Sequence, residues 1–101
     1  MNDRERGIFR KYLERRGLKL TAERLAVFDE LFARHEHFEA DELLVRLRAS
    51  HKKISRATIY RTLELLVDSG IVGRVRIGES GYRYERLRAG EHHDQIGRAH
   101  V

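Results

Sequence analysis

The sequence predicts a mostly helical domain, in which four α-helices are followed by a small two-stranded β-hairpin. Four segments place apolar residues at helical spacing, and after Gly70 the pattern changes to the alternation that is typical of strands. The chain has 101 residues, of which 41% are hydrophobic and 37% charged. It is therefore long enough for one modest hydrophobic core and too short for two domains.

The first two helices are predicted from their caps and their apolar stripes. The first runs from about residue 3 to residue 16, with Asp3 as its cap and Gly17 as its stop. Its predicted inward residues are Ile8, Phe9, Tyr12 and Leu13. Thr21 is a favourable cap for a second helix that ends near residue 34. Its apolar stripe consists of Leu25, Val27, Phe28, Leu31 and Phe32.

Two further helices and a hairpin complete the prediction. The third helix covers about residues 40 to 49, and Ser55 caps a fourth helix that ends at Gly70. The inward residues of these helices are predicted to be Leu43, Leu44, Leu47, Ile59, Leu63, Leu66 and Val67. Extended runs follow on both sides of a glycine-containing loop at residues 78–81, which indicates a hairpin.

Two short helices followed by a basic hairpin are typical of a winged helix-turn-helix, with the fourth helix as recognition helix and the hairpin as wing. If the apolar positions of the fourth helix are buried, its outer side is left with Arg56, Thr58, Tyr60 and Arg61. Arginine can pair with guanine through two hydrogen bonds, and threonine and tyrosine can contact phosphate. The alternative is a winged-helix protein-interaction module with solvated arginines and no specific DNA binding.

The charge is unevenly distributed along the chain, whose net charge is +5. Residues 1–24 carry a net charge of +4 and residues 48–88 one of +6, whereas residues 25–47 between them carry −4. This pattern is compatible with ordinary solvated helix faces. It also fits two positive surfaces that face one polyanion, with the acidic helix turned away.

Several functional classes lack support in the sequence. Without cysteine the chain has no disulfide, thiolate zinc site or thiol nucleophile. No apolar run approaches the ~20 residues of a membrane span, and the N-terminal segment has no apolar stretch of signal-peptide length. No phosphate-binding glycine loop and no HExxH helix occur. We therefore expect a cytoplasmic protein that is not an enzyme and does not enter a membrane.

Several motifs between residues 7 and 94 resemble the N-terminal DNA-binding domain of the ferric uptake regulator family, in the family's order and close to its spacing. They are GLKLTAER at 17–24, HFEADEL at 37–43, SRATIYRTL at 55–63, SGIV at 69–72, and YE at 84–85 followed by HHD at 92–94. The resemblance implies a metal-responsive transcription regulator, usually a repressor. It implies a homodimer of the full-length protein on AT-rich palindromic operator DNA, although we expect the present chain to be monomeric.

The resemblance also assigns DNA-binding residues. It places Tyr60 and Arg61 in the major groove and Ala57 and Thr58 close to it, beside the Arg56 that the helix pattern indicates. Lys19, in the loop before the second helix, would reach into an AT-rich minor groove, where narrow geometry attracts cations. The alternative for Lys19 is a solvated loop lysine.

A regulatory metal site is implied by the resemblance as well. Its ligands map to His37, Glu85 and His93, and the last ligand falls at position 95, which is glutamine here. Nitrogen and oxygen ligands suit zinc, iron(II) or manganese. His92 and Asp94 could join a second site, and any structural zinc site is expected in the missing C-terminal domain. Without the resemblance, His37 would be interpreted as a surface histidine.

These considerations divide the chain into three parts. We expect a winged-helix domain at residues 1–88, and at 89–94 a hinge that starts a missing dimerisation and metal-binding domain. Residues 95–101 are expected to be a non-native tail, because IGRAHV at 96–101 is the translation of one reading frame of a common sequencing adapter. On this interpretation His100 is not a ligand.

Overall fold

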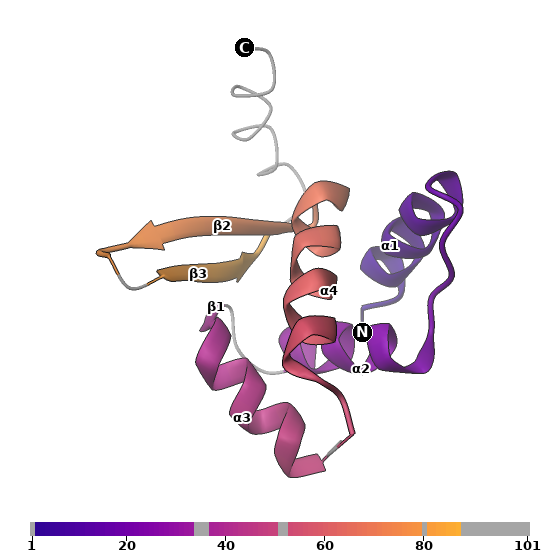
Figure 1. Cartoon of the computed structure of the whole chain (residues 1–101). Coiled ribbons are helices and arrows are strands. Elements are labelled where there is room, and N and C mark those ends of the chain that lie inside the picture. The colour runs from indigo at the N-terminus through magenta and orange to yellow at the C-terminus, as the bar shows by residue number, and fades with distance from the viewer. Residues whose placement is uncertain (1, 34–36, 51–52, 80, 88–101) are drawn as a thin grey trace.

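The computed structural model confirms the predicted fold class, four helices with a small antiparallel wing (Figure 1). It describes residues 2–33, 37–50, 53–79 and 81–87. The elements in chain order are α1 (Asp3–Arg15), α2 (Ala22–Ala33), β1 (His37–Glu39), α3 (Ala40–Ser50), α4 (Arg56–Ser69), β2 (Val72–Ile77) and β3 (Gly81–Arg86). Within the described part of the chain, no helix is both long and apolar enough to cross a membrane.

Most of the predicted helix ends are confirmed by their hydrogen bonds. The Ser55 hydroxyl accepts the backbone N–H of Thr58 at 3.1 Å and caps α4, and Gly70 ends α4 in the left-handed region at a φ of 92°. Thr21 accepts the N–H of Arg24 at 3.2 Å at the start of α2. The prediction for Asp3 is wrong. Asn2 is the N-cap residue of α1 and makes no side-chain cap bond. Its Nδ2 donates to the carbonyl of Phe32 at 3.2 Å, and its Oδ1 accepts a hydrogen bond from Nη2 of Arg86 at 3.5 Å.

The core is a single cluster to which all four helices and the three strands contribute buried side chains. The ring of Phe28 stacks on Phe32 with centroids 4.4 Å apart and on Phe9 at 6.1 Å. The prediction that Ile8 faces inward is wrong, since its side chain is 36% exposed. The fully buried residues of α1 are Phe9 and Leu13, which are one turn apart. The contact stripe is therefore narrow, and Ile8 lies at its edge.

The sheet contains a strand that the sequence pattern does not predict. β1 pairs antiparallel with β3, so the strand order is β1-β3-β2 rather than a lone hairpin. Phe38 of β1 is the Cα partner of Tyr84 in β3, and both side chains are buried. Since α3 begins at the residue after β1, this pairing ties the wing directly to the helix-turn-helix (Figure 1).

Candidate nucleic-acid interface and metal site

The outer face of α4 presents the side chains that the sequence selected. Arg56, Ala57 and Arg61 are exposed, whereas Tyr60 is half-buried. The guanidinium carbon of Arg56 lies 6.0 Å from the centre of the Tyr60 ring, within the range of a cation–π contact. The inward side of the same helix buries Ile59 and Leu63. The packing of α4 therefore leaves the side chains of Arg56 and Arg61 and the half-buried ring of Tyr60 accessible to a binding partner.

Thr58 has a structural role that the sequence interpretation did not include. Its backbone N–H donates to the Ser55 hydroxyl, and its own hydroxyl accepts a hydrogen bond from that group at 3.1 Å. Its carbonyl accepts a hydrogen bond from Thr62 at 2.7 Å. Thr58 thus helps to fix the first turn of α4, where the helix dipole favours an anion. Its contact with DNA stays a prediction.

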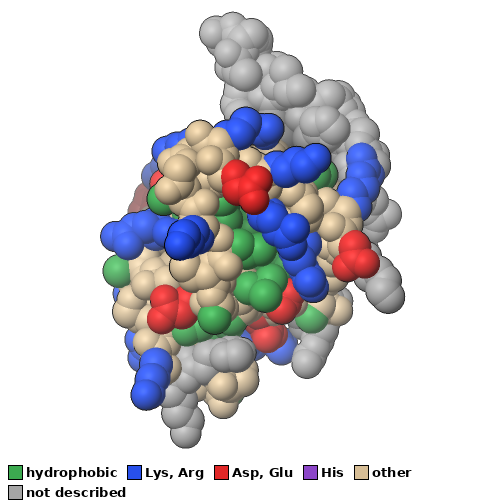
Figure 2. All heavy atoms as spheres, turned by 90° about the vertical axis from the view of Figure 1, so that its right-hand side faces the viewer, with side chains coloured by type: hydrophobic (Ala, Val, Ile, Leu, Met, Phe, Trp, Pro, Cys, Tyr) green, Lys and Arg blue, Asp and Glu red, His purple; other side chains and the backbone are tan. Residues whose placement is uncertain are grey.

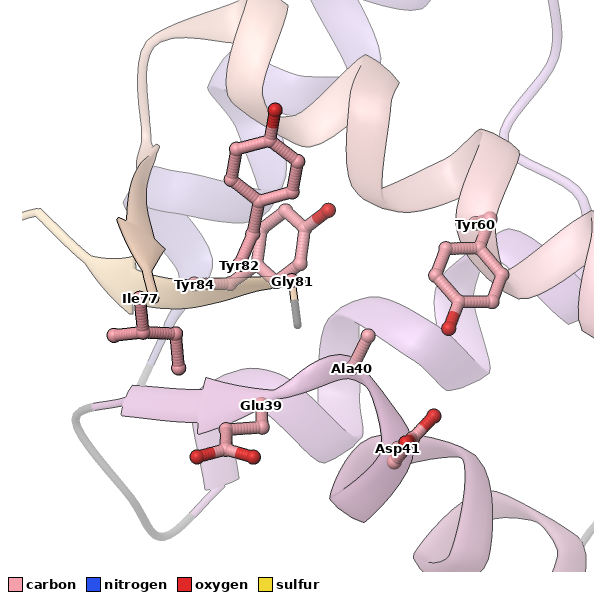
Figure 3. A pocket seen from close by; sticks show the side chains of 8 residues that line it. All are labelled: Glu39, Ala40, Asp41, Tyr60, Ile77, Gly81, Tyr82 and Tyr84. Carbon is pink, nitrogen blue, oxygen red and sulfur yellow. The ribbon is translucent and has the colours of Figure 1, made fainter. Parts of the chain in front are cut away.

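A hollow of about 110 Å³ separates α4 from the sheet and the start of α3 (Figure 3). Its lining consists of Glu39, Ala40, Asp41, Tyr60, Ile77, Gly81, Tyr82 and Tyr84. Tyr60 extends from α4 in the direction of α3, where Asp41 lies, while Tyr82 and Tyr84 come from β3. Burial raises the pKa of Tyr84 above 10.0, and nearby Arg74 partly offsets this rise. The half-buried position of Tyr60 is explained by this hollow.

The wing contributes two arginines that the sequence analysis did not single out. Arg74 and Arg76 of β2 are exposed, and they are the Cα partners of Tyr84 and Tyr82 in β3. The guanidinium carbon of Arg74 lies 4.6 Å from the centre of the Tyr82 ring, and its Nη1 is 3.7 Å from a carboxylate oxygen of Glu64. The two-residue spacing of these arginines in a strand was the available signal, because it places both on one face.

Lys19 lies exposed in the loop between α1 and α2. Its carbonyl accepts a hydrogen bond from Nη1 of Arg24 at 2.6 Å, which attaches the loop to the first turn of α2. In Figure 1, α4 stands between this loop and the β2–β3 hairpin. Figure 2 shows many Lys and Arg side chains, with fewer acidic ones, over the side of the molecule that α1 occupies. Basic groups thus lie on both sides of α4.

Two of the predicted metal ligands are brought together by the sheet. His37 of β1 and Glu85 of β3 are direct Cα partners, although 47 residues separate them in the sequence. Glu85 is partly exposed, and its carboxylate is 3.7 Å from Nε of Arg83. No group of three His, Cys, Asp or Glu residues that could hold a metal occurs among the residues the structure describes. The other predicted ligands, His92, His93 and Asp94, lie outside those residues.

Comparisons with known proteins agree with this geometry. The model of the ferric uptake regulator family matches residues 15–100. The peroxide-responsive repressor PerR of Staphylococcus saprophyticus is 37% identical over 73 residues, which are 72% of this chain and 49% of that protein. The ferric uptake regulation protein of Campylobacter jejuni is 31% identical over 90 residues, 87% of this chain and 57% of that protein. The chain therefore spans about half the length of these relatives.

Solved structures give the same result. A manganese uptake regulator superposes with a TM-score of 0.68 at 30% identity, over 79% of this chain and 59% of that one. The ferric uptake regulator from Pseudomonas aeruginosa with manganese gives a TM-score of 0.65 at 26% identity, over 77% of this chain and 59% of that one. The named relatives are regulators and repressors, not enzymes. The family model, the sequence relatives and the fold agree, and the chain belongs to the ferric uptake regulator family.

Proposed function

We propose that this chain is the DNA-binding domain of a metal-responsive, cytoplasmic transcription regulator, acting as a repressor. The observation that carries the proposal is the outer face of α4, on which Arg56, Tyr60 and Arg61 are accessible. The first turn of this helix is fixed by the cap at Ser55. In the longer protein implied by the family, two such domains in a homodimer would read the halves of an AT-rich palindromic operator. Avidity would then supply the affinity that one winged helix lacks.

The contacts with DNA divide into two kinds. Arg61 and Tyr60 would meet base edges in the major groove, with Ala57 and Thr58 close by and Arg56 near the same groove. Lys19 would enter the minor groove, and its tethered loop supports this role because the backbone beside it is held by Arg24. Phosphate contacts position the domain, whereas contacts with base edges select the sequence.

The paired positions of His37 and Glu85 support a regulatory metal site of this domain. An imidazole nitrogen and a carboxylate oxygen suit zinc, iron(II) or manganese, so the donor set fits the family's metals. With His93, these residues would hold a divalent ion that joins the β1–β3 pair to the segment after β3, and His92 and Asp94 would serve a second site. Metal binding would thus bias how the two DNA-binding domains of the homodimer are placed relative to each other.

A selection from random-sequence duplexes, followed by affinity measurements on the selected DNA, tests the proposal. We expect Arg61→Ala to cost roughly 1–3 kcal/mol of binding free energy and to relax the selected sequence. Lys19→Ala should weaken binding of all duplexes and lower the salt slope by about 1. Arg10→Ala, which removes the same charge from an exposed position on α1, is the control.

Three outcomes would contradict the assignment. Unchanged affinity in both variants would exclude α4 and the Lys19 loop as the DNA-binding surface. An equal loss in Arg10→Ala would show that only the net charge matters. If no duplex sequence is enriched and weak binding depends on salt alone, the result favours the alternative, a protein-interaction module without specific DNA binding.

A further inference from the structure

The exposed face of α4 carries one carboxylate beside the residues that we expect to read DNA. Glu64 follows Tyr60 by four residues and Arg61 by three, so it neighbours both on the helix surface. The side chain of Glu64 is 67% exposed. An unpaired carboxylate at this position would repel the phosphates on either side of the major groove. A cation that neutralises Glu64 would therefore favour DNA binding.

Arg74 of the wing is such a cation. Its Nη1 lies 3.7 Å from Oε2 of Glu64, and among the described residues Glu64 forms no other ion pair. The guanidinium carbon of Arg74 is also 4.6 Å from the centre of the Tyr82 ring, in the range of a cation–π contact. Tyr82 of β3 thus supports the arginine of β2, which in turn joins the wing to α4.

The pKa of Tyr84 places this ion pair close to Tyr60. Burial raises the pKa of Tyr84 and nearby Arg74 partly offsets the rise, whereas Glu64 and Tyr60 each raise the pKa further. Such electrostatic effects fall with distance, so these groups are close neighbours. Tyr60 and Tyr84 also line the same hollow between α4 and the sheet (Figure 3). The Glu64–Arg74 pair therefore lies beside a residue that we expect to contact bases.

The geometry of the Glu64–Arg74 pair gives it little value for folding. The distance between Nη1 and Oε2 is too long for a hydrogen bond, and the Arg74 and Glu64 side chains are 36% and 67% exposed. Ion pairs of this kind contribute little to stability. Two opposite charges this close nevertheless largely cancel each other's field at a third, more distant charge. The pair can therefore affect the binding of a polyanion without stabilising the fold.

We propose that Arg74 is a positioning residue for DNA binding, which acts by neutralising Glu64 on the outer face of α4 and does not contact DNA itself. The inference rests on the proposed DNA binding through α4. The Tyr82 ring keeps the guanidinium beside the carboxylate. Arg61 forms no ion pair with another described residue and stays available for DNA. The wing thus acts on DNA binding through the charge of the recognition helix.

A double-mutant cycle on the 101-residue chain tests this role, with fluorescence anisotropy of a selected duplex at low salt as the measurement. We expect Arg74→Met to weaken binding about three- to tenfold, because Glu64 is then unpaired. Glu64→Gln alone should change the affinity less than about twofold, since Arg74 already neutralises this charge. The double variant should bind within about twofold of the original chain. Thermal melting of each variant checks that the fold is intact.

Arg76 provides the matched control. It is exposed, lies two residues after Arg74 on the same face of β2, and forms no ion pair with another described residue. Glu64→Gln should therefore have the same small effect in Arg76→Met as in the original chain. If Glu64→Gln strengthens the binding of Arg74→Met and Arg76→Met equally, only net charge matters and the inference is wrong. An equal loss from Arg74→Met with and without Glu64→Gln would show that Arg74 contacts DNA directly, which also refutes it.

Arg61→Ala distinguishes failure of the inference from failure of the proposed function. If Arg61→Ala leaves the affinity for the selected duplex unchanged, α4 does not face the DNA, and the inference fails together with that assignment. If Arg61→Ala weakens binding but the effects of Arg74→Met and Glu64→Gln are additive, the DNA-binding face stands and only the role of Arg74 is refuted.

Discussion

Ser55 allows stability and DNA binding to be changed separately at one position. Its hydroxyl accepts the Thr58 N–H and donates to the Thr58 hydroxyl, each at 3.1 Å. Ser55→Ala leaves that N–H without its capping partner, which should cost about 1 kcal/mol of folding free energy. The rest of α4 is held by buried Ile59, Leu63 and Leu66, so the loss stays in the first turn. In a domain of this size, 1 kcal/mol lowers Tm by roughly 4–8 °C.

Ser55→Asp should leave the stability of the domain almost unchanged and weaken its binding to DNA. Aspartate is as good a cap as serine, and its charge is favourable at a helix N-terminus, so Tm should stay within about 2 °C of the original. The same carboxylate would stand at the helix end that we expect to approach phosphate. DNA binding should therefore weaken ~3- to 10-fold at low salt, and by less at higher salt.

Circular dichroism melting and fluorescence anisotropy with a selected duplex measure the two properties. If Ser55→Asp binds duplex as tightly as the original chain at low salt, the N-terminal end of α4 does not approach the DNA backbone. If Ser55→Ala melts at the original temperature, the hydrogen bonds at this cap do not stabilise the fold.

Three further predictions concern the core, the sheet and assembly. Phe28→Ala should cost about 3–5 kcal/mol in urea unfolding, since it removes a ring stacked on two others; a loss below about 2 kcal/mol would show that the core is loosely packed. Because burial raises the pKa of Tyr84, the stability from its neutral phenol is complete below pH 10 and is lost as the pH rises through that pKa. Tyr84→Phe should therefore flatten the fall in stability above about pH 10, and an unchanged slope would exclude Tyr84 as its cause. Sedimentation should show a monomer, because the exposed apolar side chains of the described residues lie on separate elements; a tight dimer at micromolar concentration would contradict this.

Local sequence patterns predict the helices well and the sheet only in part. Thr21, Ser55 and Gly70 mark helix ends through bonds to their own neighbours, so their roles can be seen in short segments. The strand β1 has three residues, too few for an alternating pattern, and it is a strand only because β3 lies beside it. The error at Ile8 has a similar origin, since the width of the buried stripe of α1 depends on how that helix packs.

The candidate sites, like the fold, could be predicted from local sequence only in part. The outer face of α4 follows from helical spacing, and the structure leaves Arg56 and Arg61 exposed there. The neighbouring positions of His37 and Glu85 could not be derived from spacing along the chain, and only the family resemblance connected them. The cross-strand register supplies the physical reason for that connection. The DNA contacts of Lys19 and Tyr60 remain predictions.

The pairing of β1 with β3 closes a loop that contains α3, α4 and β2, nearly half of the chain. Closing so long a loop costs more chain entropy than forming the local β2–β3 hairpin, so this ladder should form late in folding and open early. Amide hydrogen exchange at Phe38 should therefore be faster than at the centre of the hairpin. A metal ion bound by the paired residues His37 and Glu85 would hold this loop closed and slow the amide hydrogen exchange at Phe38. Metal binding could then be measured without DNA, as slower amide hydrogen exchange in β1.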